Sequence, residues 1–370
     1  MENLIQKPKK QMLNYINVFR GLAILLIVAG HTMQFGNENT LLNKVVYEIL
    51  TGGTALFIFI SGFLFQHLSA KYEYKNYLSK KWTNVILPYL ITAIPGVILC
   101  FALPTLYGNP FDGLNPIAQI GAFLTTGRVH NVPTWYIPMI CIYFLLADVF
   151  IKLDRNNLLY KAMPIMFLIT FFIPRMAIEP EYLVNMTYFE KWISYLLYIL
   201  NGFIHFMFLY VLGMWFSGNK DKIEYCYKWR WLLIFLMLSI SVLDVYLNMT
   251  LHISNNTISK IFLTLIVLAY LKHYDEKIIS NEKLNKTLDF IAKYSFSLFF
   301  IHWYVFFAFN QIFSMEKVLP VNLTTDIFGV IVIVVLRFFT VTGVSLLLLV
   351  IVKKLLNKFK IENTRSIIGI

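Results

Sequence analysis

The amino-acid sequence consists of long apolar blocks that alternate with short breaks rich in charged residues or in Pro, Gly and Asn. Each block is close to the roughly 20 residues that a helix needs to cross a bilayer at about 1.5 Å per residue. We therefore predict an all-α fold, a polytopic transmembrane helical bundle of about ten spans. The predicted spans lie approximately at residues 15–35, 45–66, 85–103, 134–151, 162–178, 195–216, 231–250, 258–271, 294–313 and 327–352.

The composition excludes several classes of protein. Of the 370 residues, 58% are hydrophobic and only 14% are charged, whereas an ordinary soluble domain has about 25% charged residues. A disordered chain, a coiled coil and a typical cytosolic enzyme are excluded. We expect a single membrane domain over residues 1–370 with no appended soluble domain. The three cysteines, Cys100, Cys141 and Cys226, indicate neither a disulfide framework nor a metal site.

The N-terminal segment Met1–Gln11 carries three lysines ahead of an apolar run, as a signal peptide does. The run is too long for the apolar core of a signal peptide and contains Arg20 and His31. We predict that it is retained as the first span.

Lysine and arginine residues are distributed unevenly between the two sides of the predicted bundle. With the N-terminus inside, 24 of the 32 fall in inner segments and two, Arg20 and Arg337, fall within spans. Because cytoplasmic loops collect basic residues, both termini are predicted to be cytoplasmic. The net charge of +12 then reflects this topology, not nucleic-acid binding. We expect the protein in the cytoplasmic (inner) cell membrane. The six outer residues are Lys44, Arg128, Arg175, Lys191, Lys260 and Lys317.

The longest predicted outer connection runs from Pro104 to Pro133 and is rich in glycine and proline. A connection of this length in a compact bundle is usually functional or disordered. Its apolar stretch Ile117–Leu124 is a candidate to re-enter the membrane. The sequence shows no internal repeat, which weakens the interpretation as a secondary transporter.

Ionisable side chains inside the predicted spans are the main candidates for function, because each is costly in a membrane unless it is paired or faces an aqueous cavity. They are Arg20, His31, Glu48, Asp148, His205, Asp244, His302 and Arg337.

Arg20 and His31 form the sharpest pair. They are eleven residues apart, and at about 100° per residue they share one helix face about 16 Å apart. A guanidinium suits phosphate or pyrophosphate because its planar fork donates two parallel hydrogen bonds. An imidazole suits proton transfer or transient acylation. In the structural alternative, Arg20 reaches the inner headgroups and His31 bonds a neighbouring helix.

Two further ionisable groups lie deep in late spans. For His302, which precedes Trp303, function and a hydrogen bond between helices are both open. Arg337 needs a partner, and Asp244, Glu48 or a ligand phosphate are the candidates.

Aromatic and small residues carry weaker signals. Trp135 and Tyr136 lie where an interfacial aromatic belt is expected, and belt membership competes with stacking on a sugar. At Ser61-Gly62 we expect two helices to approach closely, with a secondary role in shaping a tunnel.

Five sequence blocks, in order along the chain, resemble the membrane acyltransferase-3 family. The first is Asn17–His31, in which ten residues separate Arg20 from His31. The other four are Leu56–Leu64, Leu87–Tyr89, Thr134–Ile137 and Ser297–His302. One departure is that relatives often carry two basic residues three positions apart before the proline of the third span, whereas here Lys81 is followed three positions on by Asn84.

The resemblance implies transfer of an acyl group, commonly acetyl, from a coenzyme A thioester at the cytoplasmic side to a hydroxyl of a glycan or glycolipid. Acetyl-CoA or another acyl-CoA is then a donor substrate, with no permanently bound cofactor. Arg20 and His31 would be the essential catalytic pair. Arg20 would face the phosphate or the thioester of the donor, and His31 would act as general base or acyl relay. A further contribution of the inner loop to donor binding rests on Lys80 and Lys81.

The candidate substrate-binding residues are Trp135, Tyr136, His302 and Arg337. The expected partners are the bilayer, acyl-CoA, a glycan or glycolipid acceptor, and the machinery of polysaccharide synthesis. Two other functions fit the same bundle: an exporter or flippase of a polysaccharide or polyprenyl-linked glycan, and a non-catalytic scaffold. The scaffold should tolerate both Arg20→Ala and His31→Ala, and the exporter should lose surface glycan itself.

Overall fold

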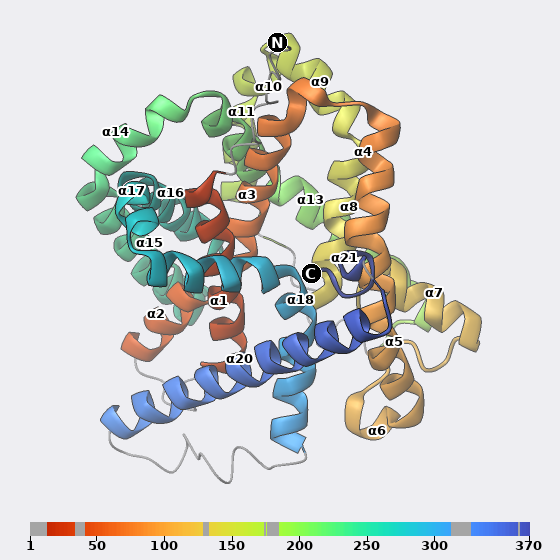
Figure 1. Ribbon diagram of the computed structural model, residues 1–370. Coiled ribbons are helices and arrows are strands. Elements are labelled where there is room, and N and C mark those ends of the chain that lie inside the picture. Colours follow the sequence, from red (N-terminus) through yellow and green to blue (C-terminus); the bar gives the residue numbers. More distant parts are fainter. Residues whose placement is uncertain are drawn as a thin grey trace, which may run out of the picture.

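The structure is a computed structural model that describes residues 13–33, 41–128, 133–173, 175, 185–311, 327–361 and 363–370. Every regular element in these ranges is a helix (Figure 1), as the predicted all-α fold requires. The segment Met1–Gln11 and Lys317, which entered the topology prediction, lie outside the described residues.

The longer helices are α1 (Asn14–Thr32), α3 (Gly53–Leu68), α5 (Leu87–Ala102), α13 (Tyr188–Gly218), α15 (Arg230–Leu251), α16 (Thr257–His273), α18 (Glu282–Gln311) and α20 (Ile327–Lys358). The shorter helices are α2 (Leu41–Leu50), α4 (Tyr74–Lys81), α6 (Pro104–Tyr107), α7 (Pro116–Thr126), α8 (Tyr136–Leu145), α9 (Ala147–Arg155), α10 (Leu158–Lys161), α11 (Met163–Phe172), α14 (Ile223–Lys228), α17 (Asp275–Ser280) and α21 (Thr364–Ile368). Three 3₁₀ turns, η1 (Ser69–Lys71), η3 (Pro133–Trp135) and η4 (Lys220–Lys222), and one π-helical turn, η2 (Trp82–Ile86), complete the described elements.

The described residues contain seven helical segments that are long and apolar enough to cross a membrane. They are Asn14–Thr32, Leu41–Lys71, Tyr74–Ala102, Tyr188–Gly218, Arg230–Leu251, Glu282–Gln311 and Ile331–Lys358. The count is eight if α8 and α9, which meet at 51°, form one span. The predicted spans 162–178 and 258–271 correspond to α11 and α16, of only 10 and 17 residues. The chain is a helical membrane bundle, and the count of ten spans stays a prediction.

Helix α18 begins well before the predicted start of its span at residue 294. Asn281 accepts a hydrogen bond from the backbone N–H of Leu284 at 3.1 Å and so caps the first turn. Glu282 in that turn is favourable at the positive end of the helix dipole. The charged residues that we expected in a loop are therefore helical, and they place Asp289 and Lys293 beside α1.

Helices α3 and α13 pack against each other at the centre of the bundle through two glycines. A Cβ atom at Gly62 would lie 1.9 Å from the carbonyl oxygen of Tyr210, and one at Gly213 would lie 2.1 Å from that of Phe59. Backbone cannot move aside as a flexible side chain can, so both positions require glycine. The close approach predicted at Ser61-Gly62 is confirmed.

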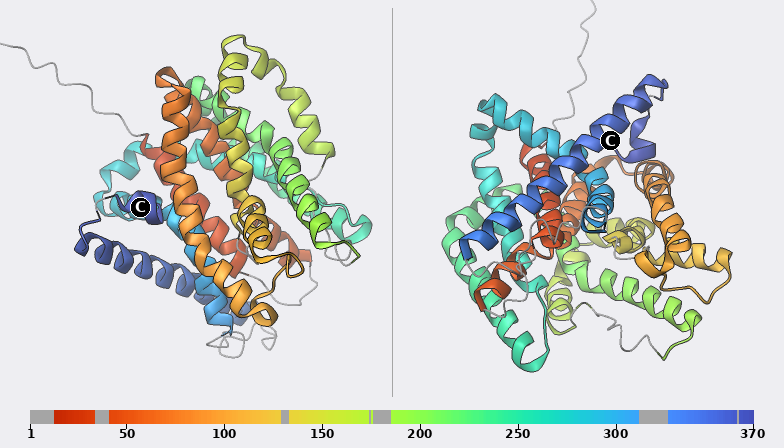
Figure 2. Two further views of the ribbon diagram at one scale, coloured as in Figure 1. Left: turned by 90° about the vertical axis from the view of Figure 1, so that its right-hand side faces the viewer. Right: turned by 90° about the horizontal axis from the view of Figure 1, so that it is seen from below.

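Helix α20 runs obliquely across the other helices (Figures 1 and 2) and ends in a reversal of the chain. Lys360 adopts a left-handed φ of 58°, and the N–H of Ile361 donates to the carbonyl of Leu356 at 3.0 Å. This is the hydrogen-bond pattern of a Schellman C-cap. The chain turns back, and α21 packs against α5 and η2.

Candidate active site

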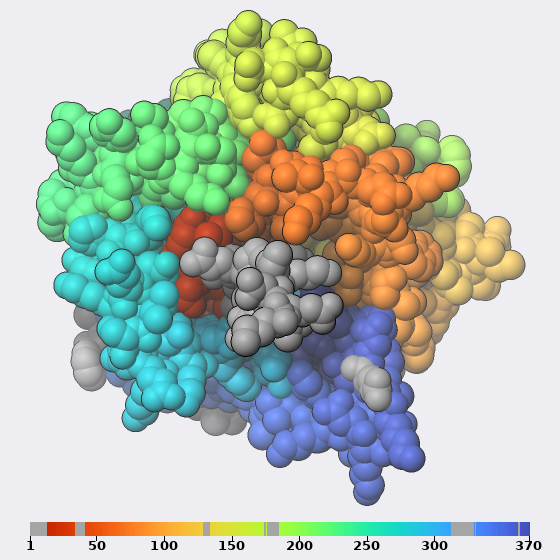
Figure 3. All heavy atoms as spheres, turned by 45° about the horizontal axis from the view of Figure 1, so that its top comes forward, coloured from red at the N-terminus to blue at the C-terminus, as the bar shows by residue number. Residues whose placement is uncertain are grey.

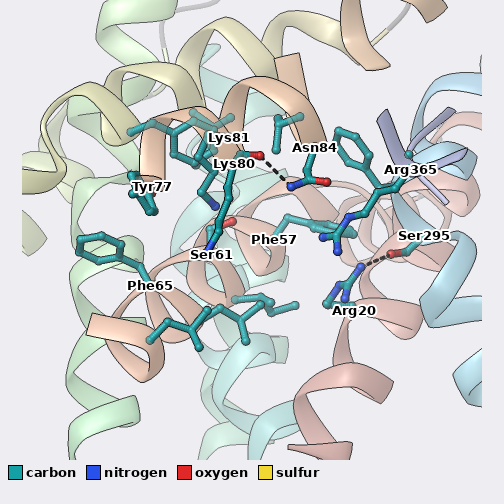
Figure 4. Close-up of a pocket in the computed structure, with 18 of the residues that line it drawn as sticks. Arg20, Phe57, Ser61, Phe65, Tyr77, Lys80, Lys81, Asn84, Ser295 and Arg365 are labelled. Carbon is teal, nitrogen blue, oxygen red and sulfur yellow. Dashed lines mark hydrogen bonds between the residues drawn. The ribbon is translucent and has the colours of Figure 1, made fainter. Parts of the chain in front are cut away.

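A cavity of about 760 Å³ lies between α1, α3, α4, α8, α18 and α21 (Figure 4). Figure 3 shows a face of the molecule on which parts of α1 (red), the α3–α4 segment (orange) and the C-terminal segment (blue) are visible. The volume is within the range of about 300–1,000 Å³ that is typical of small-molecule sites. Four predicted site residues, Arg20, Lys80, Lys81 and Tyr136, line this cavity together.

The cavity lining carries an excess of positive charge. Its six basic residues are Arg20, Lys71, Lys80, Lys81, Lys293 and Arg365. Its two acidic residues are Glu73 and Asp289. A cleft lined mainly by one sign of charge concentrates ligands of the opposite sign, so this cavity favours an anion.

Arg20 is half-buried in the wall formed by α1 and α18. The helices approach closely here, since a Cβ atom at Gly21 would lie 3.3 Å from the backbone nitrogen of Ala292. One guanidinium nitrogen, Nη2, donates to Ser295 Oγ at 3.3 Å and to the carbonyl of Ala292 at 3.5 Å. These bonds are long, and among the described residues no carboxylate lies within ion-pair distance of Arg20. Most of its five N–H donors are therefore available to a ligand.

Lys81 lies on the opposite wall of the cavity, at the end of α4. Its Nζ is 4.5 Å from the ring centroid of Phe144 and 5.1 Å from that of Tyr77. Aromatic faces stabilise an ammonium group without accepting its hydrogen bonds in the way a carboxylate does. The charge of Lys81 is thus held in place but not neutralised.

The π-helical turn η2 follows Lys81 directly and contains Asn84. Pro88 has no N–H to donate to the carbonyl of Asn84, and its ring would clash with that carbonyl in a regular α-helix. A wider turn relieves this conflict. The Asn84 side chain donates instead to the carbonyl of Lys80 at 2.8 Å (Figure 4). The departure from the family pattern at Asn84 therefore leaves an amide in the cavity lining where relatives often carry a cation.

The deep end of the cavity, away from its basic residues, is apolar and narrow. Phe57, Tyr136 and Phe296 also line a second space of only about 20 Å³, together with Ile27. That volume holds little more than one water molecule. Tyr136 is fixed there by a 3.2 Å hydrogen bond between its hydroxyl and Ser61 Oγ. We call this narrow, mainly apolar space the constriction.

His31 lies beyond the narrow space and does not line the cavity. Ile27, which lines the narrow space, is one turn before His31 and on the same face as Arg20. Along one face of α1, Arg20 lines the cavity, Ile27 lines the constriction, and His31 follows one turn later. The ring of His31 lies 5.4 Å from that of His302 and 5.3 Å from that of Trp303, between centroids.

His302 is fully buried, and one contact determines which of its ring nitrogens carries the proton in the neutral form. Its Nδ1 lies 2.8 Å from the carbonyl of Leu298, which can only accept, so Nδ1 carries the proton in the neutral ring. Nε2 is then an acceptor, and it is buried without a hydrogen-bond partner. This nitrogen lies beside a second imidazole and is free to accept a hydrogen bond.

Comparison with known families assigns the chain. The sequence profile of the acyltransferase-3 family, described as an acyltransferase domain, matches residues 13–351. The chain belongs to this acyltransferase family. No curated protein and no solved structure gives a match.

Three predicted substrate-binding residues of this acyltransferase, Trp135, His302 and Arg337, do not line the cavity. The indole of Trp135 contacts the guanidinium of Arg175 at 4.4 Å and stacks on Phe206 at 6.5 Å. These contacts engage the ring, for which both belt membership and stacking on a sugar were open. Arg337 is buried in α20 and does not line the cavity either.

The two carboxylates that we named as candidate partners of Arg337 have other partners in the structure. Lys260 Nζ donates to Glu48 Oε1 at 3.1 Å and to its carbonyl at 2.6 Å. Asp244 accepts from the hydroxyl of Ser254 at 3.0 Å and from the N–H of Asn255. Lys260, which we counted among the outer residues, is 1% exposed within α16.

Five charged residues that line the cavity of the acyltransferase were not predicted as site residues: Lys71, Glu73, Asp289, Lys293 and Arg365. Asp289 and Lys293 precede the predicted span 294–313 and were treated as loop residues. Arg365 lies beyond the matched residues 13–351 and reaches the cavity only because the chain reverses after α20. The uninterrupted helical pattern from Glu282 onward was a signal for Asp289 and Lys293. No spacing rule indicated Arg365.

Proposed function

We propose that this acyltransferase moves an acyl group, acetyl in the first instance, from cytoplasmic acyl-CoA to a hydroxyl of a cell-surface or lipid-linked glycan. The single observation that carries the proposal is the arrangement along α1: Arg20 in a basic cavity, then an apolar constriction, then His31. A soluble phosphorylated thioester and a hydroxyl acceptor would be handled at the two ends of this path.

The basic cavity supports a role in donor binding. Arg20, Lys80 and Lys81 come from opposite walls and present cations that no described carboxylate neutralises within 4 Å. Coenzyme A carries its negative charge on phosphates and its reactive thioester at the end of a slender, mostly neutral arm. In the proposed complex the phosphates stay among the basic residues, and the arm points toward Tyr136 and the constriction.

Two routes of acyl transfer are open at His31. As a general base, the imidazole takes the proton of the acceptor hydroxyl while its oxygen attacks the thioester carbonyl, and the CoA thiolate leaves and is protonated. As a nucleophile, the imidazole nitrogen first takes the acyl group from sulfur and then passes it to the hydroxyl. Both routes form one ester and release one thiol, and both use the neutral imidazole.

His302 is proposed as a positioning residue for His31. With its proton on Nδ1 directed to Leu298, its Nε2 can accept the N–H of a neighbouring imidazole and leave the other nitrogen of His31 basic. Tyr136 is proposed to contact the acyl arm, because it lines both spaces.

Mass spectrometry of surface glycan tests the proposal. Cells that express the wild type should carry a mass increment of one acyl group per modified sugar, and His31→Ala should remove it while the protein remains inserted. His252→Asn is a matched control, because His252 is exposed and its φ of 56° suits asparagine. Identical spectra for wild type and His31→Ala would overturn the acyltransfer role of His31.

The same experiment separates an exporter from an acyltransferase. An exporter should lose surface glycan itself on disruption of the path, with acylation of any remaining glycan unchanged. The constriction of about 20 Å³ favours passage of an acyl group over passage of a sugar chain.

A further inference from the structure

The C-terminal segment brings a second guanidinium into the donor cavity. Arg365, Gly369 and Ile370 all line it, and Figure 4 shows the side chain of Arg365 pointing toward that of Arg20. The two residues are 345 positions apart in the sequence, and Arg365 lies outside the range that the family profile matches. The placement of Arg365 in the cavity is therefore an observation of this structure and does not follow from the family match.

The position of the segment is set by several contacts that do not involve Arg365. Ser297 donates a hydrogen bond to the carbonyl of Ile368, and Thr364 Oγ1 donates to the carbonyl of Ile370 at 2.7 Å. Gly369 has a φ of 78°, and a Cβ atom there would lie 2.5 Å from the ring of Phe296. The backbone of the segment is thus seated on α18, and the Arg365 side chain is free to serve another purpose.

The charge arrangement around Arg365 calls for an anion. Among the described residues, its guanidinium forms no ion pair. Arg20 and Lys81, which line the same cavity, also form none. Like charges that face each other raise the energy of a site unless an anion lies between them. Two planar guanidiniums match a phosphate or diphosphate better than point charges do, because each donates two parallel hydrogen bonds.

We propose that Arg365 and Arg20 form a two-sided clamp for the phosphate groups of a soluble donor, so that the C-terminal segment completes the donor site. The proposal rests on the proposed acyl-CoA function and adds to it a binding residue and a preference for phosphorylated over phosphate-free thioesters. Arg365 is exposed at the mouth of the cavity, so its replacement should not disturb folding.

Direct binding to the full chain in phosphatidylcholine nanodiscs tests the clamp. The probes are CoA, inorganic pyrophosphate, and acetyl-pantetheine, which has no phosphate. Arg365→Gln should weaken binding of CoA and pyrophosphate about tenfold or more and leave acetyl-pantetheine unchanged, because a charge-assisted contact to phosphate is lost. Arg365→Lys should fall between, since it keeps the charge and loses the fork. The matched control is Arg155→Gln, an exposed arginine outside the cavity, which should bind like the wild type.

The outcomes distinguish the two proposals. If Arg365→Gln binds CoA and pyrophosphate as the wild type does, the clamp is overturned and the donor role of the cavity stands. If the wild type binds pyrophosphate through Arg365 but does not bind CoA, the clamp stands and acyl-CoA is excluded as donor. Nanodiscs with phosphatidylglycerol test the other source of phosphate: displacement of pyrophosphate by the anionic lipid, dependent on Arg365, would overturn the assignment to a soluble ligand.

Discussion

His31 and His302 show how one hydrogen bond prepares a second residue. Because Nδ1–H of His302 donates to the carbonyl of Leu298, Nε2 carries no proton in the neutral ring and can only accept a hydrogen bond. That nitrogen is buried without a hydrogen-bond partner, which costs free energy. The ring of His31, 5.4 Å away between centroids, is the neighbour that can use it.

Replacement of His302 by phenylalanine should therefore slow the reaction without weakening donor binding. We expect His302→Phe to lower kcat about tenfold or more and to leave the KM for acyl-CoA within about twofold, whereas His31→Ala loses about 10²-fold or more. Steady-state kinetics with varied acyl-CoA measure the two constants separately. An unchanged kcat for His302→Phe would remove the positioning role.

His205 provides the contrast, because both of its ring nitrogens are satisfied. Nδ1 donates to the carbonyl of Ile173 at 2.8 Å, and the hydroxyl of Thr257 lies 2.8 Å from Nε2. His205→Phe should lower the free energy of unfolding by about 1–3 kcal/mol, with kcat per folded molecule unchanged. Thermal unfolding in detergent, combined with kinetics on the soluble fraction, checks this. A selective loss of kcat would assign His205 a chemical role.

The buried pair Lys260 and Glu48 should respond very differently to single and double replacement. Lys260→Met leaves the Glu48 carboxylate buried without its cation and should cost about 3–5 kcal/mol, while Lys260→Met with Glu48→Gln should recover part of that loss. The exposed pair Lys286 and Glu282 is the control, and Lys286→Met should change stability by less than about 1 kcal/mol. Equal losses at both sites would contradict the importance of burial.

At the scale of elements, the contact between α3 and α13 is the tightest constraint on the bundle. Gly62→Ala and Gly213→Ala each place a methyl group against backbone, and overpacking of this kind costs about 1–3 kcal/mol or more. Gly218→Ala and Gly343→Ala are matched controls, since a Cβ atom at either meets nothing within 4 Å. Thermal stability of the four variants in one detergent measures the difference, and equal stability would contradict the close packing.

Several elements were predictable from the sequence, and the reasons are local. The face shared by Arg20 and His31 follows from helix geometry alone, and the glycine contact at Gly62 follows from the need of small residues at close helix crossings. The start of α18 was misplaced because charged residues were assigned to a loop, although they also fit a helix. The short α11 was overestimated because apolar composition alone does not mark where a helix ends.

The cavity itself was only half predictable, because its walls come from distant parts of the chain. Arg20, Lys80, Lys81 and Tyr136 were named from chemistry and family resemblance. Arg365 was not predicted. Its position depends on the left-handed turn at Lys360 and on the hydrogen bond from Ser297 to the carbonyl of Ile368. Such tertiary contacts leave no periodic trace in the sequence.

At the scale of the whole molecule, the start of α1 and the cavity belong to one face. Asn14 donates to Asp275 Oδ1 at 3.1 Å and Asn17 donates to Asp289 Oδ1 at 2.8 Å. The segment around these acids also carries several of the lysines that the sequence assigns to the inside. A cytoplasmic donor reaches the cavity only if this face is cytoplasmic, so the orientation decides whether the proposed function is physically accessible.

Cysteine labelling in intact cells tests that orientation. Lys283→Cys should react with a membrane-impermeant maleimide only after permeabilisation, and Asp112→Cys, in the predicted outer connection, should react before it; both positions are exposed. Background from Cys226 should be low, because burial raises the pKa of its thiol to about 11 and the reactive thiolate is scarce at neutral pH. As the pH rises toward 11, the thiolate fraction of Cys226 increases. Labelling of Cys226 should therefore increase with pH, which identifies its contribution. Labelling of Lys283→Cys in intact cells would place the basic cavity outside and separate it from its proposed donor.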